Sequence, residues 1–244
     1  MGKTILITGA STGIGAQTAL TLAKDNLLFV HYNASAEAAM QVVAQVEQLG
    51  GRAVPVQADV TTEKGCEALV AAVAAQTDHL DVLINNAGGL VQRQAADALQ
   101  WELMERVFAL NTFSTMKITS LCIPLLRKST QDPNIVNVSS VVIRHGGAGA
   151  TIYAAAKGGV DVFTRGMAKE LAPAIRCNAV CPGVIDTPFH HKVSTPQQME
   201  AWAANNPLKR NGLPEHIADT IALLTRNSFL NGETIDVNGG LTIR

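Results

Sequence analysis

This chain of 244 residues has few aromatic residues and almost no net charge. Phe, Trp and Tyr make up 4% of the sequence, and 19 lysines and arginines nearly balance 20 aspartates and glutamates, for a net charge of -1. So few aromatic side chains offer little for stacking against single-stranded nucleic acid. The balanced charge gives no electrostatic reason to expect nucleic acid or an anionic membrane as a partner.

Cysteines in metal-binding or disulfide spacing are also absent, and so are long apolar runs. The four cysteines are Cys66, Cys122, Cys177 and Cys181, and their spacing fits neither a disulfide framework nor a zinc site. We therefore predict buried, reduced thiols and no metal site. No apolar run approaches the length of a membrane span, and no secretion signal is visible. These features predict a cytoplasmic protein without a membrane partner.

What the sequence does contain is an alternation of short β-branched runs with stretches of helical periodicity. The expected strands are Thr4–Thr8, Leu27–Tyr32, Ala53–Ala58, Val82–Ile84, Ile135–Val138, Ile175–Val180 and Thr234–Val237. The expected helices cover residues 17–24, 36–49, a segment capped by Thr61, and residues 99–127 and 153–171. Strands that alternate with helices build a parallel sheet covered on both faces. We predict an α/β fold, a doubly wound parallel sheet in a single domain over residues 1–244.

Residues 186–210 are the least regular part of the chain. They contain Pro188, Pro196 and Pro207 and follow the sixth expected strand, at the sheet edge where α/β proteins bind ligands. A loop or short-helix lid over a substrate fits this segment better than a linker does.

A glycine-rich segment, Thr8–Gly15, follows the first expected strand and opens the first helix. Glycines leave room for backbone N–H groups to approach a pyrophosphate, whose negative charge the helix N-terminus favours. The spacing G-x-x-x-G-x-G differs from the usual dinucleotide fingerprint, and a tight strand–helix turn is the alternative interpretation. The expected nucleotide contacts are Gly9, Ser11, Thr12, Gly13, Ile14 and Gly15.

Two further strand ends would face the same ligand. The fourth strand ends at Asn85–Gly88, where asparagines can tie neighbouring strands together and Gly88 leaves room for the nucleotide. Asp59 ends the third strand, where an adenine ring would lie, although an aspartate at this point also commonly starts a helix. The expected contacts are Asp59, Val60, Asn86, Ala87 and Gly88.

Tyr153 and Lys157 are four residues apart in a helical stretch, so their side chains share one face. A tyrosine phenol has a reference pKa near 10, too high for a good base at neutral pH. A nearby ammonium group, helped by a cationic nicotinamide ring, would have to lower the pKa of Tyr153 by about three units, roughly 4 kcal/mol. Each residue alone could instead be structural, Tyr153 as a helix-start aromatic and Lys157 as a surface lysine.

Together these motifs resemble the short-chain dehydrogenase/reductase family, and within it the 3-oxoacyl-carrier-protein reductases. The matching residues are Thr8–Gly15, Asn85–Gly88, Asn111, Ser140, Tyr153–Lys157, Pro182–Gly183 and Asn238–Gly240, in the family order. The resemblance implies a Rossmann-type fold and NAD(P)-dependent hydride transfer between a nicotinamide and a carbonyl or secondary alcohol. It also implies a homotetramer or homodimer built on the helices expected near 100–127 and 153–171.

The resemblance implies the site roles as well. Tyr153 would be the general acid in reduction and the general base in oxidation, and Lys157 would also hold the nicotinamide ribose. Ser140 would hydrogen-bond the substrate oxygen, and Asn111 would hold a water for proton relay. Ser139 competes with Ser140, but strand alternation and the family spacing, thirteen residues before the tyrosine, select Ser140. The expected contacts to the nicotinamide are Tyr153, Lys157, Pro182, Gly183, Ile185 and Thr187.

The end of the second expected strand bears on the choice between NAD and NADP. An acidic residue there would hydrogen-bond the ribose hydroxyls and repel a 2′-phosphate, but this chain has Tyr32. The arginine that often holds the phosphate is missing too, and Thr12 stands where many NADP-type members have a basic residue. Asn33 and Ser35 could hold a phosphate as neutral donors. We predict a preference for NADP(H), with NAD(H) as the alternative.

Basic residues near the expected pocket favour a polar or anionic carbonyl substrate over a steroid. They are His190, His191, Lys192, Lys209 and Arg210 in the lid, and Arg144 and His145 before Tyr153. Solvated surface charge and subunit contacts are alternative interpretations of these residues. The alternative functions are a sugar or polyol dehydrogenase, a non-catalytic NAD(P)-binding regulator and a sugar-nucleotide epimerase. The intact Tyr153–Lys157 pair argues against the regulator, and the short chain argues against the epimerase.

Overall fold

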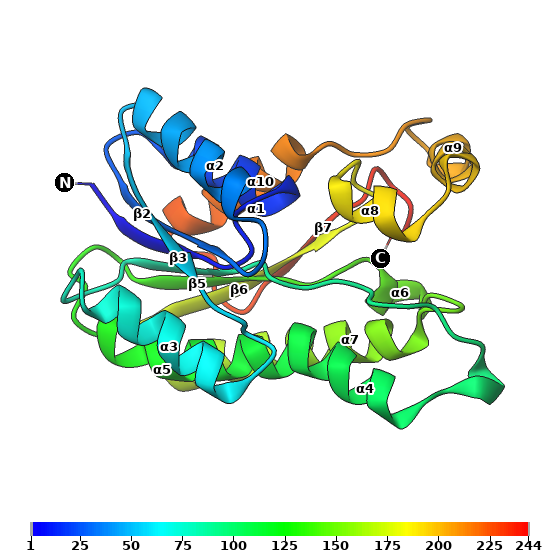
Figure 1. The fold of residues 1–244 in the computed structure, drawn as a ribbon, viewed down its shortest axis with the longest axis horizontal. Helices are drawn as coiled ribbons and strands as arrows, with labels where there is room; N and C mark the ends of the chain where they lie inside the picture. The colour runs from blue at the N-terminus through cyan, green and yellow to red at the C-terminus, as the bar shows by residue number, and fades with distance from the viewer. Residues whose placement is uncertain (1, 244) are drawn as a thin grey trace.

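A parallel sheet of seven strands runs through residues 2–243, the part of the chain that the computed structural model describes (Figure 1). The strands are β1 (Thr4–Ile7), β2 (Leu27–Tyr32), β3 (Arg52–Gln57), β4 (Val82–Asn85), β5 (Asn134–Val138), β6 (Arg176–Pro182) and β7 (Thr234–Val237). Their order across the sheet is β3-β2-β1-β4-β5-β6-β7. The predicted doubly wound parallel sheet is confirmed, and every strand lies within two residues of its expected bounds.

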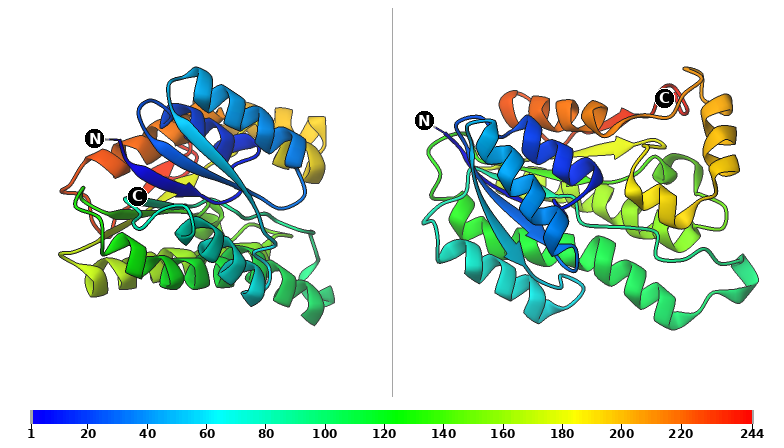
Figure 2. Two further views of the ribbon diagram at one scale, coloured as in Figure 1. Left: turned by 60° about the vertical axis from the view of Figure 1, so that its left-hand side comes forward. Right: turned by 45° about the horizontal axis from the view of Figure 1, so that its top comes forward.

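Helices cover the sheet on both sides (Figures 1 and 2). One side carries α1 (Gly13–Thr21), α2 (Ala36–Gln48) and α10 (Pro214–Arg226). The other side carries α3 (Glu63–Ala74), α4 (Trp101–Phe108), α5 (Ser114–Leu126) and α7 (Thr151–Leu171). The short helices η1 (Ala96–Ala98), α6 (Val142–His145), α8 (Pro188–Val193) and α9 (Pro196–Asn205) lie toward the carboxyl ends of the strands.

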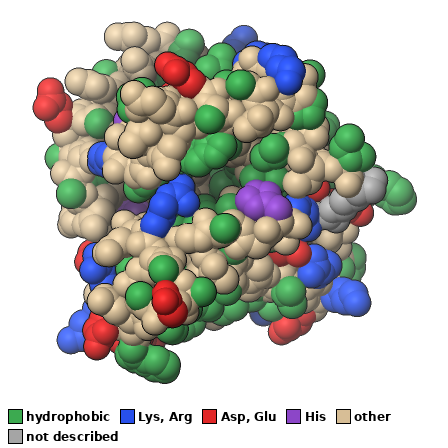
Figure 3. All heavy atoms as spheres, turned by 90° about the vertical axis from the view of Figure 1, so that its right-hand side faces the viewer, with side chains coloured by type: hydrophobic (Ala, Val, Ile, Leu, Met, Phe, Trp, Pro, Cys, Tyr) green, Lys and Arg blue, Asp and Glu red, His purple; other side chains and the backbone are tan. Residues whose placement is uncertain are grey.

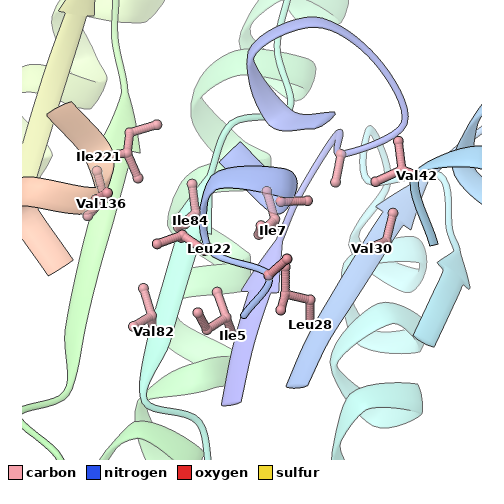
Figure 4. Close-up of a cluster of buried hydrophobic side chains, with 14 of the residues drawn as sticks. Ile5, Ile7, Leu22, Leu28, Val30, Val42, Val82, Ile84, Val136 and Ile221 are labelled. Carbon is pink, nitrogen blue, oxygen red and sulfur yellow. The ribbon is translucent and has the colours of Figure 1, made fainter. Parts of the chain in front are cut away.

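Alternating strand residues supply two separate apolar layers. Ile5 and Ile7 of β1 pack under α1, α2 and α10, together with the side chains drawn in Figure 4. Leu6, between them, points to the other face and packs with Leu69 of α3 and Ile118 of α5. Successive strand residues point to opposite faces, so an unbroken apolar strand is the sequence expected for a sheet buried on both sides.

Two helical expectations need correction. Thr62, not Thr61, caps α3: its hydroxyl accepts the Gly65 N–H at 3.0 Å, while the Thr61 hydroxyl donates to the Asp59 carboxylate at 2.7 Å. The helix expected over residues 99–127 is also not continuous. A π-helical turn, η2 (Ala109–Phe113), joins α4 to α5, and such a turn leaves little trace in the apolar periodicity.

The long helix α10 was not predicted, although the sequence signals it. Pro214 stands in its first turn, and Ile217, Ala218, Ile221 and Ala222 give it a buried stripe. This helix packs against α1 and the β5–β6 side of the sheet. No helix between residues 2 and 243 combines the length and apolar character needed to cross a lipid bilayer.

The chain direction across the sheet reverses between β1 and β4. From β1 the chain moves outward to β2 and β3, then returns to place β4 on the opposite side of β1. Ligands bind at such a reversal point, outside the carboxyl ends of the strands. Thr8–Gly15 follows β1 and Asn85–Gly88 spans the end of β4, so both predicted motifs lie at this point. The lid segment, residues 186–210, contains the short helices α8 and α9, as expected.

Candidate active site

A cavity of about 760 Å³ opens at the carboxyl ends of the strands. It extends from the glycine-rich loop after β1 to the lid, and Figure 3 shows the hollowed face at this end of the molecule, with Lys or Arg and His side chains around it. The predicted site residues that line it are Gly9, Ser11, Thr12, Gly13, Ile14, Tyr32, Asn33, Asp59, Val60, Asn86, Ala87, Gly88, Ser140, Tyr153, Lys157, Pro182, Gly183, Ile185 and Thr187. Gly15, Ser35 and Asn111 do not line it.

The glycine-rich loop has the backbone that only glycine adopts without strain. Gly9 and Gly13 have φ angles of +62° and +57°, in the left-handed region. Gly15 faces inward: a Cβ there would lie 2.3 Å from the Gly9 carbonyl oxygen. It therefore closes the loop rather than lining the cavity. Ser35, also outside the cavity, occupies the position before α2.

His31 supports this loop from below, a role that the sequence did not reveal. Its Nδ1 accepts the Gly9 N–H at 3.0 Å, and its Nε2 lies 3.1 Å from the Ala58 carbonyl oxygen. The ring is therefore neutral, with its proton on Nε2. Burial lowers the pKa of His31 below its ordinary value, which keeps Nδ1 available as an acceptor.

Hydrogen bonds from Thr8 and Asn86 tie the ends of β1 and β4 together. The Thr8 hydroxyl accepts the N–H groups of Asn86 and Ala87 at 2.9 and 3.0 Å. The Asn86 side-chain amide donates to the carbonyl oxygens of Thr8 and Gly9, both at 2.9 Å. The expectation that asparagines join neighbouring strand ends is confirmed for this pair.

Gly88 lets two predicted catalytic residues approach the end of β4. A Cβ at this position would lie 2.8 Å from both the Asn111 side-chain oxygen and the Lys157 ammonium. Asn111 itself is buried on the π-helical turn, one layer behind the cavity wall. Its amide nitrogen donates to the carbonyl oxygens of Gly89 and Val107, each at 2.8 Å, and its oxygen accepts the Gly89 N–H at 2.9 Å.

Tyr153 and Lys157 lie near the start of α7 and face the end of β5. The Lys157 ammonium donates to the Val138 carbonyl at 2.8 Å and lies 5.9 Å from the centre of the Tyr153 ring. Ser139 and Ser140 follow β5 directly. The Ser139 hydroxyl donates to the Lys157 carbonyl at 3.0 Å, whereas a hydrogen bond joins Ser140 to the Tyr153 phenol. The geometry thus supports Ser140 rather than Ser139 as the partner of a substrate oxygen.

Burial dominates the protonation of this pair. It raises the pKa of Tyr153 to about 12, although the hydrogen bond with Ser140 opposes the rise. It also lowers the pKa of Lys157 to about 8. The expected lowering of the Tyr153 pKa by Lys157 and a cationic nicotinamide ring concerns the protein with its nucleotide bound, and it stays a prediction. At neutral pH the phenol keeps its proton.

Most of the basic residues expected at the pocket lie elsewhere. His145 and His190 line the cavity, but Arg144 pairs with Asp236 at 3.0 Å, and His191 lies 2.9 Å from the Asp186 carboxylate. The remaining lid residues, Lys192, Lys209 and Arg210, also lie outside it. The expectation that Arg144 faces the pocket is therefore wrong. Two residues that the sequence did not single out, Arg93 and Trp202, do line it.

The cavity fits a dinucleotide. Its glycine loop is open to backbone contact at Gly9 and Gly13, and a helix, α1, begins at Gly13. The positive end of that helix favours an anionic pyrophosphate. From this loop the cavity continues to Tyr153 and Lys157, where a reactive ring would meet a proton donor.

Comparisons with known proteins agree with this geometry. A family model described as "Enoyl-(Acyl carrier protein) reductase" matches residues 9–242. The 3-oxoacyl-[acyl-carrier-protein] reductase FabG of Thermotoga maritima is 36% identical over 246 residues, covering 99% of this chain and 98% of that protein. An NADH-dependent reductase responsible for alginate metabolism has a TM-score of 0.91 at 30% identity, covering 100% of this chain and 98% of that one.

A second solved structure is the angucycline C-6 ketoreductase LanV with bound NADP. It has a TM-score of 0.90 at 28% identity, and the match covers 98% of this chain and 95% of that one. The sequence resemblance, the parallel sheet and the cavity with its Tyr153–Lys157 pair therefore agree with one another. The chain belongs to the short-chain dehydrogenase/reductase family and is an NAD(P)-dependent oxidoreductase.

Proposed function

We propose that this protein reduces a carbonyl group, with Ser140 holding the carbonyl oxygen and Tyr153 donating the proton. The observation that carries the proposal is a single cavity that joins the glycine loop to Ser140, Tyr153 and Lys157. The nicotinamide nucleotide supplies the hydride when bound. The pKa of Tyr153, about 12, keeps the phenol protonated at neutral pH, which is the state that reduction requires.

Lys157 and Asn111 support the proton donor from behind. Lys157 would hold the ribose hydroxyls through its ammonium, which already lies at the cavity wall beside Val138. Asn111 would hold a water on the route by which Tyr153 recovers its proton. Its buried amide is fixed by the backbone of Gly89 and Val107, so its orientation is set before any ligand binds.

Replacing Tyr153 by phenylalanine tests the proposal. The change should lower kcat about 10²–10⁴-fold, the usual contribution of a general acid, and leave nucleotide affinity nearly unchanged. Tyr32→Phe is the matched control, because Tyr32 is the other tyrosine of the chain and lines the same cavity. It should affect the KM for the nucleotide at most. Full activity of Tyr153→Phe would refute the assignment, and no turnover by the wild type on any carbonyl would favour a regulator.

NADPH is the nucleotide that we propose for the reduction. Tyr32 stands at the end of β2, so no carboxylate there repels a 2′-phosphate. Ser11, Thr12 and Asn33 line the cavity near this strand end and can donate hydrogen bonds to a phosphate. A comparison of kcat/KM for the two nucleotides tests this preference. A tenfold or greater preference for NADH would contradict it.

We propose 3-oxoacyl thioesters as the first substrate class, because a relative with 36% identity is named a 3-oxoacyl-[acyl-carrier-protein] reductase. Sugars and polyols are the alternative class. NADPH oxidation against oxo acids, oxo esters, 3-oxoacyl thioesters, sugars and diketones would separate the two. Turnover confined to the sugars would favour the alternative.

We also propose a single-domain subunit that assembles as a homotetramer in the cytoplasm. One sheet spans the described residues, and apolar side chains are exposed on the helical side that α4, α5 and α7 form, with Phe113 57% and Val162 62% exposed. The free, buried cysteines suit a reducing compartment. Sedimentation tests the assembly. A tetramer is expected, a dimer would support the smaller of the two predicted assemblies, and a monomer would contradict the proposal.

A further inference from the structure

Arg93 is the cationic side chain that remains available at the lid end of the cavity. It lies on the segment between β4 and α4 and lines the same cavity as Ser140 and Tyr153. Within residues 2–243 no carboxylate lies in ion-pair distance of its guanidinium. An arginine keeps its charge at all pH values relevant here and matches planar anionic groups such as carboxylates.

This guanidinium lies beside an aromatic ring of the lid. Its central carbon lies 6.0 Å from the centre of the Trp202 ring on α9, within the range of a cation–π contact. His190 of α8 packs edge-on against Trp202, with ring centres 5.7 Å apart. Burial and the charge of Arg93 lower the pKa of His190 to about 4, so His190 is neutral at pH 7. Arg93 is then the permanent positive charge of this aromatic corner.

Backbone geometry also holds Arg93 at the mouth of the cavity. Two residues before it, Val91 has a φ of +63°, which is rare for a β-branched residue. The Gln92 N–H donates to the Leu90 carbonyl at 2.8 Å, and the Gln94 N–H donates to the Gly149 carbonyl at 3.1 Å. Such strain persists only where the surroundings impose it, and here it falls in a segment whose Leu90 and Arg93 both line the cavity.

The cavity has no acid that would compete for Arg93. Asp59 is the one acidic residue among those that line it. It follows β3, and the strands β2, β1 and β4 separate β3 from β5, which carries Ser140 at its end. The Asp59 carboxylate also accepts the Thr61 N–H and hydroxyl, at 3.0 and 2.7 Å. An anionic group that entered beside Ser140 would therefore meet Arg93 and no acidic side chain of the cavity lining.

We propose that the carbonyl substrate carries an anionic group, a carboxylate or a phosphate, and that Arg93 binds this group beneath the lid. The inference rests on the proposed reductase function and names the substrate class for it. Arg93 acts on specificity and not on the chemical step, because the proton donor and the carbonyl oxygen are served by other residues.

Matched substrate pairs test this assignment. Short 2-oxo and 3-oxo acids are compared with their methyl esters, and phosphorylated hydroxyketones with their unphosphorylated counterparts. In Arg93→Gln, kcat/KM for the anionic member should fall about 10–100-fold, mainly through KM, because one charge-assisted contact is lost. The neutral member should change little. Lys192→Gln is the control, since Lys192 is an exposed lid lysine outside the cavity, and it should change neither member.

The pairs also separate the two sources of negative charge: the pair with the larger loss in Arg93→Gln identifies carboxylate or phosphate. An equal loss for both members of every pair, or a wild-type preference for the neutral members, would overturn the inference. Calorimetry on Tyr153→Phe loaded with NADP⁺ makes the result independent of turnover. If oxo acids bind there in an Arg93-dependent way but wild type reduces nothing, the reductase function fails and the anion site stands. Turnover of neutral carbonyls without Arg93-dependent binding overturns the anion site alone.

Discussion

Lys157→Met should stabilise the protein in the absence of nucleotide while it abolishes turnover. The Lys157 side chain is 3% exposed, and burial lowers its pKa from 10.5 to about 8. At pH 7 the amine is charged in both the folded and the unfolded chain, so the lowered pKa measures how much burial of this charge opposes folding. The difference, 10.5 − 8, is about 2.5 units, or about 3 kcal/mol at 1.36 kcal/mol per unit.

Methionine keeps the length and apolar volume of the lysine stem without the charge. It also removes the donor that lies 2.8 Å from the Val138 carbonyl, which takes back about 1–2 kcal/mol. The net gain is then about 1–2 kcal/mol, equivalent to a melting temperature roughly 2–8 °C higher for a chain of this size. Turnover disappears because the ribose contact and the charge beside Tyr153 are both lost.

Thermal or urea unfolding without nucleotide, repeated from pH 7 to pH 11, measures the effect. Between pH 8 and 10.5 the unfolded chain still binds a proton at Lys157 that the folded protein has released, so wild-type stability rises with pH. The variant lacks this rise, and its advantage should shrink across that window. Lys24→Met, at an exposed lysine, is the control and should stay within about 0.5 kcal/mol of wild type. A variant less stable than wild type at pH 7, or a difference independent of pH, would refute the reasoning.

Three further predictions follow from single contacts. Gly88→Ala should lower kcat/KM roughly 10–100-fold, because the new Cβ would lie 2.8 Å from the Lys157 ammonium. Gly89→Ala is the control and should leave kcat/KM nearly unchanged, because its nearest contact would lie at 3.5 Å. Equal losses in the two variants would contradict this prediction. Affinity for NAD⁺, measured by calorimetry, should be constant above pH 6.5 and fall as pH drops through the lowered pKa of His31, since a protonated Nδ1 cannot accept the Gly9 N–H. His31→Gln is the control and should show no such fall in affinity. NAD⁺ is used instead of NADP⁺ because the 2′-phosphate of NADP⁺ itself titrates near pH 6. Burial raises the pKa of all four cysteines to about 11 or 12. A disulfide reagent at pH 8 should therefore modify these thiols only after the protein unfolds. A fast-reacting thiol in the native protein would contradict their burial.

The parts of the fold that the sequence predicted are those with a local signal. An apolar strand of five residues and a helix of period 3.6 are visible in any short window, and β2 and β7 begin and end where expected. The π-helical turn at Asn111 has no such signal, because one extra residue in a helix of about twenty-five barely shifts an apolar stripe. At this turn the Asn111 side chain hydrogen-bonds the backbone of Gly89, which precedes it by about twenty residues, so the contact there is tertiary.

The same distinction separates the reaction from its substrate. Tyr153 and Lys157 lie on one helical turn and Ser140 lies one loop away, so a fixed spacing brings the three together and the sequence displays it. Arg93 and Trp202 are far apart in the sequence and come together only in the folded chain, where the guanidinium lies 6.0 Å from the centre of the Trp202 ring. The sequence analysis favoured Arg144, which is closer to Ser140 in the sequence, but Arg144 pairs with Asp236 and does not line the cavity. The arginine that can bind a substrate group is therefore the one without a carboxylate partner. Which arginine that is depends on the packing of segments distant in the sequence, and residue spacing does not reveal it.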